Sequence, residues 1–236
     1  VAAHSLAGTG RKRGGGPMTG VLIVGVGPGI AASVARRFAL GGYAVGLISR
    51  SRASTGPVAS AVAALGQRVA TETADAAEES ALVAAIDRVV EQLGAPDVVV
   101  YNAGLIQADR PGQLTHAEHQ AAYAVNVLGA LTTAAHLGPR MADNGGGTII
   151  ITGGMPQPVP ALVSLSLGKA AVRALTDLLD QEYGPHGVHV ATVTVCGAVA
   201  PGTLFDPDRI AEDYWRLHTQ PPDGWEREVV FTGSPA

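Results

Sequence analysis

The chain has 236 residues, of which 47% are apolar, enough for one domain with a buried core. Its formal net charge is −4 and only 15% of its residues are charged, which favours neither nucleic acid nor an anionic membrane as a partner. The single cysteine, Cys196, excludes an intramolecular disulfide and a cysteine-rich zinc site, and the sequence predicts no metal site.

The first 17 residues carry a short basic cluster, 11–13, followed by three glycines before Met18. The charges come after the weakly apolar part, which is the reverse of the order in a secretory signal. No apolar run reaches the roughly 18 residues that a transmembrane helix needs. We therefore expect a flexible N-terminal extension at 1–17, a single domain at 18–236, and a cytoplasmic protein without membrane contact.

Short apolar runs alternate with helical patterns along the chain. The runs typical of buried strands lie at 20–27, 43–50, 67–75, 96–104, 146–154, 189–197 and 227–233. Helical spacing occupies 30–42, 57–65, 78–93, 115–141, 164–183 and 208–218. Strands that alternate with helices in this way predict a parallel sheet with right-handed crossovers. The predicted fold class is α/β, a Rossmann-like doubly wound sheet of about seven strands with helices on both faces.

A glycine-rich turn, "GVGPGI", joins the first predicted strand to the first helix and contains Gly25, Gly27, Gly29 and Ile30. Glycines permit a sharp turn and a close approach of the backbone to a pyrophosphate, and a helix N-terminus offers N–H groups to it. In doubly wound sheets, ligands bind beyond the carboxyl ends of the strands, at the point where the strand order reverses. The position between a strand and a helix therefore favours nucleotide binding over a plain turn.

The end of the second predicted strand bears on which nucleotide is bound. Ser49 and Arg50 end this strand, and Ser51 and Arg52 follow. An acidic residue here would hydrogen-bond the ribose 2′-hydroxyl of NAD, but none is present. Two arginines can instead pair with a 2′-phosphate, although both can also be solvated surface charges. We expect NADP(H) to be favoured over NAD(H).

Further motifs follow in order on the predicted elements. Asp75 ends the third strand, Asn102-Ala103-Gly104 follows the fourth, and "NVLGA" begins at Asn126 within a helix. "GKAAVRAL", with Lys169, lies on the helix after the fifth strand. Together with the glycine turn, these motifs resemble the short-chain dehydrogenase/reductase family from about Met18 to nearly the end of the chain.

The resemblance implies further cofactor contacts. Asp75 would contact the adenine, and Lys169 would bind the nicotinamide ribose. Gly197, preceded here by Cys196 where the family has proline, and Val199 would lie beside the carboxamide. Only residues 198–206 lie between Gly197 and Pro207, which precedes the last predicted helix, so any lid over the substrate is expected to be short or absent.

The resemblance also implies hydride transfer between the nicotinamide and the carbonyl or alcohol carbon of a small molecule. In the family a tyrosine donates the proton, a lysine lowers the pKa of that tyrosine, a serine hydrogen-bonds the carbonyl and an asparagine holds a water. Lys169 and Asn126 match two of these residues. The serine position falls on Thr152 by spacing and on Gly154 by matching the strand, and Leu165 stands at the tyrosine position. The predicted catalytic residues are Lys169, Asn126 and Thr152.

Leu165 can neither donate nor accept a proton, which leaves three interpretations. In the first, the chain is an atypical NAD(P)(H)-dependent short-chain oxidoreductase whose proton comes through water held by Lys169 and Asn126. In the second, it binds NADP(H) without catalysis, as a sensor or partner subunit. In the third, the cofactor is lost, but the retained glycine turn and Lys169 argue against this. Family members commonly pair through the helices predicted here at 115–141 and 164–183, so a homodimer or homotetramer is expected.

Overall fold

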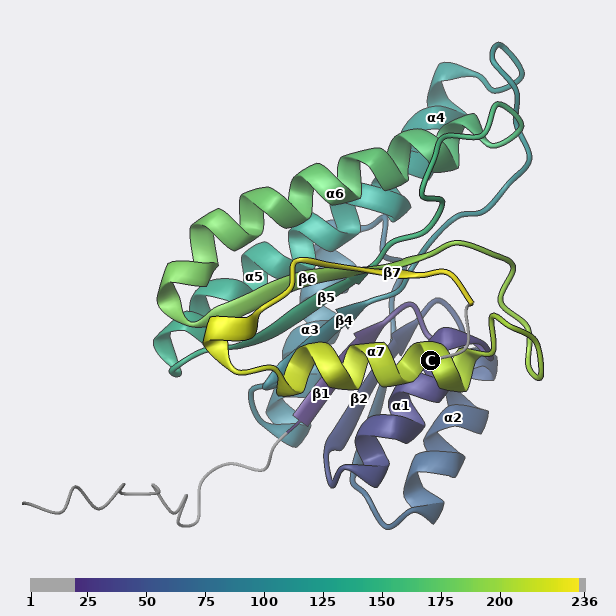
Figure 1. Cartoon of the computed structure of the whole chain (residues 1–236). Coiled ribbons are helices and arrows are strands. Elements are labelled where there is room, and N and C mark those ends of the chain that lie inside the picture. Colours follow the sequence, from purple (N-terminus) through teal and green to yellow (C-terminus); the bar gives the residue numbers. More distant parts are fainter. Residues whose placement is uncertain (1–19, 234–236) are drawn as a thin grey trace, which may run out of the picture.

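Seven parallel strands form one sheet in the computed structural model, which describes residues 20–233 (Figure 1). The order along the sheet is β3-β2-β1-β4-β5-β6-β7, and every neighbouring pair is parallel. The strands are β1 (Gly20–Val24), β2 (Ala44–Ser49), β3 (Val69–Thr73), β4 (Val98–Tyr101), β5 (Gly147–Thr152), β6 (Val188–Val195) and β7 (Glu228–Phe231). The predicted doubly wound α/β fold is confirmed, whereas the expected extension at 1–17 lies outside the described residues.

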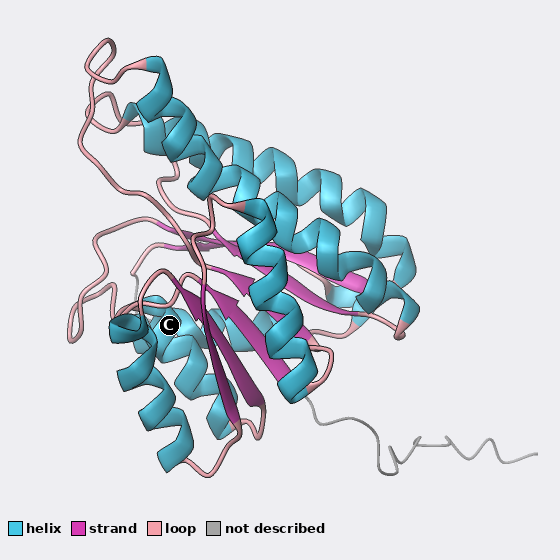
Figure 2. Ribbon diagram, turned by 180° about the vertical axis from the view of Figure 1, so that it is seen from behind, coloured by secondary structure: helices cyan, strands magenta, loops and turns pink. Residues whose placement is uncertain are grey.

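Helices cover both faces of the sheet (Figure 2). One face carries α1 (Ile30–Leu40), α2 (Arg52–Ala64) and α7 (Pro207–Thr219). The other carries α3 (Glu79–Leu93), α5 (Gly129–Asp143) and α6 (Val163–Tyr183), and α4 (His116–Tyr123) lies against the start of α6. Alternate residues of β1 pack into opposite layers, Val21 and Ile23 into one and Leu22 and Val24 into the other. Burial on both faces explains why the strands are continuous apolar runs.

Most helix bounds agree with the prediction to within two residues, but two helices differ further. Helix α2 begins at Arg52, not Pro57, because the Ser51 side chain accepts a hydrogen bond from Ala53 N and so caps the helix. The helix predicted at 115–141 contains a wide π-helical turn, Ala124–Leu128, between α4 and α5. One extra residue in a helical turn leaves the apolar spacing almost unchanged, so the pattern gave no sign of it.

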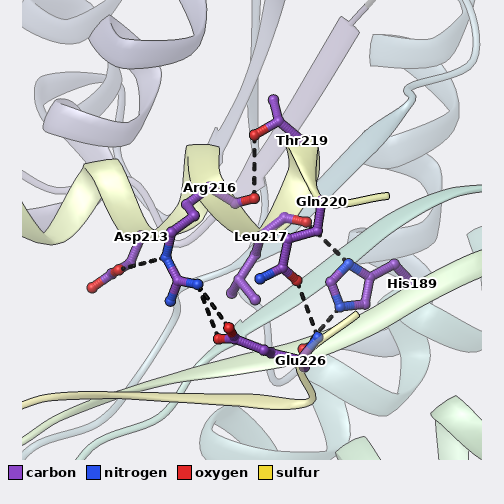
Figure 3. Close-up of polar contacts among 7 residues, drawn as sticks. All are labelled: His189, Asp213, Arg216, Leu217, Thr219, Gln220 and Glu226. Atoms are coloured by element: carbon purple, nitrogen blue, oxygen red, sulfur yellow. Dashed lines mark hydrogen bonds and ion pairs between the residues drawn. The ribbon is translucent and has the colours of Figure 1, made fainter. Parts of the chain in front are cut away.

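The last helix and the segment that leads into the last strand are held to β6 by His189 (Figure 3). Its two ring nitrogens lie 3.0 Å from Leu217 O and 2.8 Å from Glu226 O, and its ring stacks on Trp225 at 4.8 Å between centroids. Arg216 of α7 donates to both carboxylate oxygens of Glu226, at 2.9 and 3.0 Å. These contacts fix α7 against the sheet, which matters because α7 supplies a buried side chain to the candidate site.

Candidate active site

A cavity of about 830 Å³ opens at the carboxyl ends of the strands. Its wall runs from the glycine turn at Gly27 and Gly29, past the end of β5 at Thr152, to Lys169 on α6 and the loop at Val199. Because all seven strands are parallel, the segments after β1, β4, β5 and β6 meet at this one edge. The motifs that follow these strands in the sequence therefore lie close together at the carboxyl edge, as the predicted parallel sheet requires.

Gly25 forms the back of the glycine turn and does not line the cavity. It has a φ of +90°, and a Cβ added to it would lie 2.1 Å from Ala103 N. Its N–H donates to Ile48 O at 2.8 Å, and its carbonyl accepts from Asn102 Nδ2 at 2.9 Å. Gly25, Asn102 and Ala103 thus join the ends of β1, β2 and β4, and only a residue without a side chain fits at Gly25.

Gly27, Gly29 and Ile30 form the part of the turn that faces the cavity. A Cβ added to Gly27 would meet no atom within 4 Å, and one added to Gly29 would meet only the Val199 side chain, at 3.9 Å. Helix α1 begins at Ile30, so the positive end of its dipole points to this space, and no acidic residue occupies its first turn. This open N-terminus suits an anionic group such as a pyrophosphate.

The residues predicted to choose between NADP(H) and NAD(H), Ser49 and Arg50, and the predicted adenine contact Asp75 do not line the cavity but follow or end neighbouring strands at the same edge. Ser49 is buried at the end of β2, and its hydroxyl donates to Ser51 O at 2.8 Å. The Arg50 side chain is exposed. Asp75, after β3, is half-buried, and its Oδ1 accepts from Ala77 N at 3.0 Å. Ser49 and Asp75 thus order their own turns, while Arg50 extends towards solvent.

Lys169 is the one charged side chain among the described residues that line the cavity. Its Nζ donates to the main-chain oxygen of Thr152 at 2.7 Å. Burial, which disfavours the cation, lowers the pKa of Lys169 to about 8, and the charge of Arg173 adds to this effect. A lysine with this pKa is mostly protonated at pH 7 and releases a proton more readily than an exposed lysine does.

The Thr152 hydroxyl belongs to a chain of hydrogen bonds that links α7 to the segment after β4. It donates to Asn102 Oδ1 at 3.0 Å and lies 2.7 Å from the hydroxyl of Tyr214 on α7. Since the one proton of Thr152 goes to Asn102, the Tyr214 hydroxyl is the donor to Thr152. Tyr214 is fully buried, and burial raises its pKa well above the ordinary value. Sequence reasoning missed Tyr214, which has the pattern of an ordinary apolar position of an amphipathic helix.

Leu165 lies one helical turn before Lys169 on α6 and lines the cavity. The two serines beside it point elsewhere: Ser164 Oγ donates to Asp109 Oδ1 at 3.1 Å, and Ser166 Oγ donates to Val159 O at 3.3 Å. Asp109 is buried and also accepts from Ser164 N at 2.9 Å. It therefore caps α6 from the loop after β4, a role that no local pattern in the sequence indicated.

Asn126 lies in the π-helical turn and is buried behind the cavity wall. Its Oδ1 accepts from Leu105 N at 2.7 Å, and its Nδ2 donates to Leu105 O at 3.2 Å. Gly168 packs so closely that a Cβ there would lie 2.9 Å from Asn126 Cβ. The structure thus brings Asn126 next to the helix of Lys169, with its side chain holding the loop after β4. Wide turns of this kind are frequent at functional sites.

The far wall of the cavity is the segment after β6. Gly197 packs against Phe205, and Val199 lies so near Gly29 that a Cβ added to Gly29 would be 3.9 Å from the Val199 side chain. No helix or strand forms in 196–206, so the structure has no helical lid between β6 and α7. This agrees with the short connection expected from the sequence.

A cavity that runs from a glycine turn to a half-buried lysine, at the carboxyl edge of a doubly wound sheet, is the arrangement of a dinucleotide-dependent oxidoreductase. Comparison with known families makes the class specific. The sequence profile of the short chain dehydrogenases matches residues 19–206, and the chain belongs to this family of NAD(P)-dependent oxidoreductases.

Curated relatives share about a third of their aligned residues with this chain. A short-chain dehydrogenase/reductase of Armillaria gallica is 32% identical over 193 residues, which are 79% of this chain and 71% of that protein. The short-chain reductase protein NovJ of Streptomyces niveus is 30% identical over 194 residues, 81% of this chain and 72% of that protein. The probable oxidoreductase EphD of Mycobacterium tuberculosis is 30% identical over 210 residues, but these are only 36% of its length.

Solved structures give the same result. A metagenomic short-chain oxidoreductase in complex with NADP matches with a TM-score of 0.83 and 26% identity, over 91% of this chain and 96% of that one. An alcohol dehydrogenase of Thermococcus sibiricus complexed with 5-hydroxy-NADP matches with a TM-score of 0.81 and 25% identity, over 92% and 99%. Among residues 20–233, no helix combines the length and the hydropathy that crossing a bilayer requires.

Proposed function

We propose that this chain binds NADP(H) in the cavity at the carboxyl edge and acts as an atypical short-chain oxidoreductase on a small carbonyl or alcohol, without a tyrosine at Leu165. The observation that carries the proposal is the position of Lys169, which lines the cavity and donates a hydrogen bond from Nζ to Thr152 O. When bound, the nicotinamide supplies or accepts the hydride. The chain itself supplies binding, orientation and the route of the proton.

The cavity fits a dinucleotide at both ends. At one end, Gly27 leaves open space beside the N-terminus of α1, where a pyrophosphate would be held by main-chain N–H groups. At the other end, Lys169 would hold the nicotinamide ribose, and the main chain at Val199 would lie beside the carboxamide. Arg50 and Asp75 would bind the adenosine half beyond the cavity wall, after β2 and β3.

The proton route is what makes the site atypical. Leu165 offers no acid, and the hydroxyl protons of Thr152, Ser164 and Ser166 already go to protein acceptors. Lys169 is the remaining ionisable group that suits the role, directly or through a water. The loss of one general acid typically costs about 10²–10⁴-fold in rate, so slow turnover is expected with ordinary ketones.

Removing the Arg50 side chain tests the nucleotide preference. We expect Arg50→Ala to weaken NADPH binding about 10- to 100-fold, because a charge-assisted contact to the 2′-phosphate is lost. The affinity for NADH, which lacks that phosphate, serves as the internal control and is expected to stay the same. Calorimetric titration measures both. Equal affinity of the wild-type chain for the two nucleotides would contradict the preference.

The pH dependence of binding tests the role of Lys169. Its pKa of about 8 means that the cation is lost as the pH rises through this value. We expect NADPH affinity to fall roughly fivefold to tenfold between pH 7 and pH 9, because a charged donor to the ribose becomes neutral. In Lys169→Met the affinity should be lower and nearly flat across this range. A wild-type profile as flat as that of the variant would show that Lys169 does not contact the nucleotide.

A catalytically silent NADP(H)-binding protein, acting as a sensor or partner subunit, is the second candidate. Leu165 and the fully engaged hydroxyls around it favour this function. NADPH binding without turnover of any carbonyl compound, in a chain whose Lys169→Met variant loses affinity, would support it over the oxidoreductase.

We also propose that two copies of the chain pair through α4, α5 and α6. Large apolar side chains are exposed on these helices: Leu131 is 42% exposed, Leu167 61% and Leu178 63%. A groove of about 670 Å³ lined by Tyr123, Leu128 and Leu167 lies between α4 and α6. Such a concentration of exposed apolar residues is typical of an interaction surface.

Light scattering on variants of this surface tests the pairing. We expect a dimer or tetramer for the wild-type chain, and dissociation on Leu167→Glu, because a carboxylate would be buried without a partner. Leu40→Glu on α1 is the matched control, since Leu40 is 65% exposed and lies on the other side of the sheet. A wild-type monomer at micromolar concentration would remove the proposal.

A further inference from the structure

In the part of the cavity beyond the nucleotide, where a substrate would bind, the nearby hydroxyl protons already make hydrogen bonds to protein acceptors. Thr152 donates to Asn102, and the serines on either side of Leu165 donate to Asp109 and Val159. Cys196 donates weakly to Thr194 O, and burial raises the pKa of its thiol. The amide of Gln157 is exposed and does not release a proton. The described part of the cavity wall therefore has one effective proton donor, Lys169, at the end that the nucleotide would occupy.

The remaining wall of this part of the cavity is apolar. It is formed by Ile106, Met155, Pro156, Val159, Leu162 and Leu165. Among the described lining residues none is a carboxylate, and Lys169 alone is charged. An anionic ligand would find no second cation there beyond Lys169, and a cationic ligand would find no counter-charge and would meet Lys169 itself. The wall thus selects an uncharged, apolar compound.

Apart from Lys169 at the nucleotide end, the described wall offers no free acid, and this selects further among uncharged acceptors. A saturated ketone that takes up a hydride becomes an alkoxide, which is about as basic as hydroxide. Such a product needs a proton donor in the transition state. A quinone instead becomes an aryloxide, whose conjugate acid has a pKa of about 10, like the tyrosine phenol. The charge is spread over the ring, so the step does not depend on a positioned acid.

We propose that the substrate of this site is an uncharged quinone bound against the apolar wall, an inference that rests on the proposed function. The quinone gains a hydride, which is two electrons and one proton, and becomes the hydroquinone monoanion. The hydride comes from the reduced nicotinamide nucleotide, which is oxidised, and one proton from water completes the hydroquinone. Met155, Val159 and Leu162 contact the ring, and Leu165 closes the wall where the family places a proton donor.

Three probes of similar size test this inference: menadione, the anionic 1,2-naphthoquinone-4-sulfonate and the saturated ketone 2-decalone. Calorimetry on the chain loaded with NADP⁺ is expected to show menadione binding at least tenfold more tightly than the sulfonate. With NADPH, after subtraction of the rate without protein, menadione turnover should exceed that of 2-decalone by at least about 10²-fold. Equal binding of the sulfonate, or equal turnover of 2-decalone, would overturn the inference.

A charge placed in the wall locates the binding site. Val159→Glu is expected to weaken menadione binding at least tenfold and to change NADPH affinity less than twofold. Val159 is 40% exposed, so the substitution does not bury a charge on folding. Val230→Glu, at a 49% exposed residue of β7, is the matched control with unchanged binding. Absence of NADPH binding would overturn the proposed function, whereas NADPH binding without saturable menadione binding would overturn this inference alone.

Discussion

Leu165→Tyr is expected to raise the turnover of 2-decalone with NADPH about 10²–10⁴-fold, the range that one general acid contributes. The new hydroxyl would enter the cavity one helical turn from Lys169, whose positive charge favours the ionised form of the phenol and so lowers its pKa. The ring would fill space in a cavity of about 830 Å³, so the wall does not have to move far. Steady-state kinetics on purified protein measures the effect.

Leu165→Phe is the control for this result, because it adds the same ring without the hydroxyl. We expect it to leave ketone turnover within a few-fold of the wild-type value. Menadione turnover should gain at least tenfold less than ketone turnover in Leu165→Tyr, since the aryloxide has less need of the acid. Equal gains from tyrosine and phenylalanine would show that shape, and not proton donation, limits the wild-type chain.

Gly25→Ala is expected to destabilise the fold by about 2–6 kcal/mol, the second large effect. Gly25 has a φ of +90°, which costs an alanine about 1–3 kcal/mol. The added Cβ would also lie 2.1 Å from Ala103 N, and overpacking of this kind costs about 1–3 kcal/mol more. For a domain of this size the combined cost corresponds to a fall in Tm of about 4–24 °C.

Gly27→Ala provides the matched control in the same turn. Its Cβ would meet no atom within 4 Å, so we expect a change in the free energy of unfolding of no more than about 0.5 kcal/mol. Thermal and urea unfolding of both variants measures the difference. If Gly25→Ala proved as stable as Gly27→Ala, the main chain at residue 25 would have to be able to shift away from Ala103.

The sheet was predictable because each strand is a local feature of the sequence. Burial on both faces makes the strands continuous apolar runs, and the turns at their carboxyl ends contain glycine or polar residues. Helix starts were harder to predict. Pro57 is the predicted start of a helix that begins five residues earlier, after the Ser51 cap, and the π-helical turn at Ala124–Leu128 keeps a helical spacing throughout.

The main-chain part of the candidate site was also predictable, since it follows from where the strands end. The side-chain part was not. Asp109 caps a helix that begins at Val163, and Tyr214 donates to the hydroxyl of Thr152 from the last helix. Both are long-range contacts between residues that look ordinary in their own segments. Thr152 itself was predicted, but not that its proton would be directed to Asn102.

The strand order has a consequence for how the chain folds as it is made. Val21 pairs with Val45 on one side and with Val98 on the other, so β1 lies between a near neighbour and a distant one. During synthesis β1 can join β2 early, but its other edge stays open until β4 has emerged. Parallel pairing between distant segments is slow, and an open apolar edge promotes aggregation. The nascent chain is therefore most vulnerable before residues 98–101 are available, and its solubility depends on how quickly that second edge is closed.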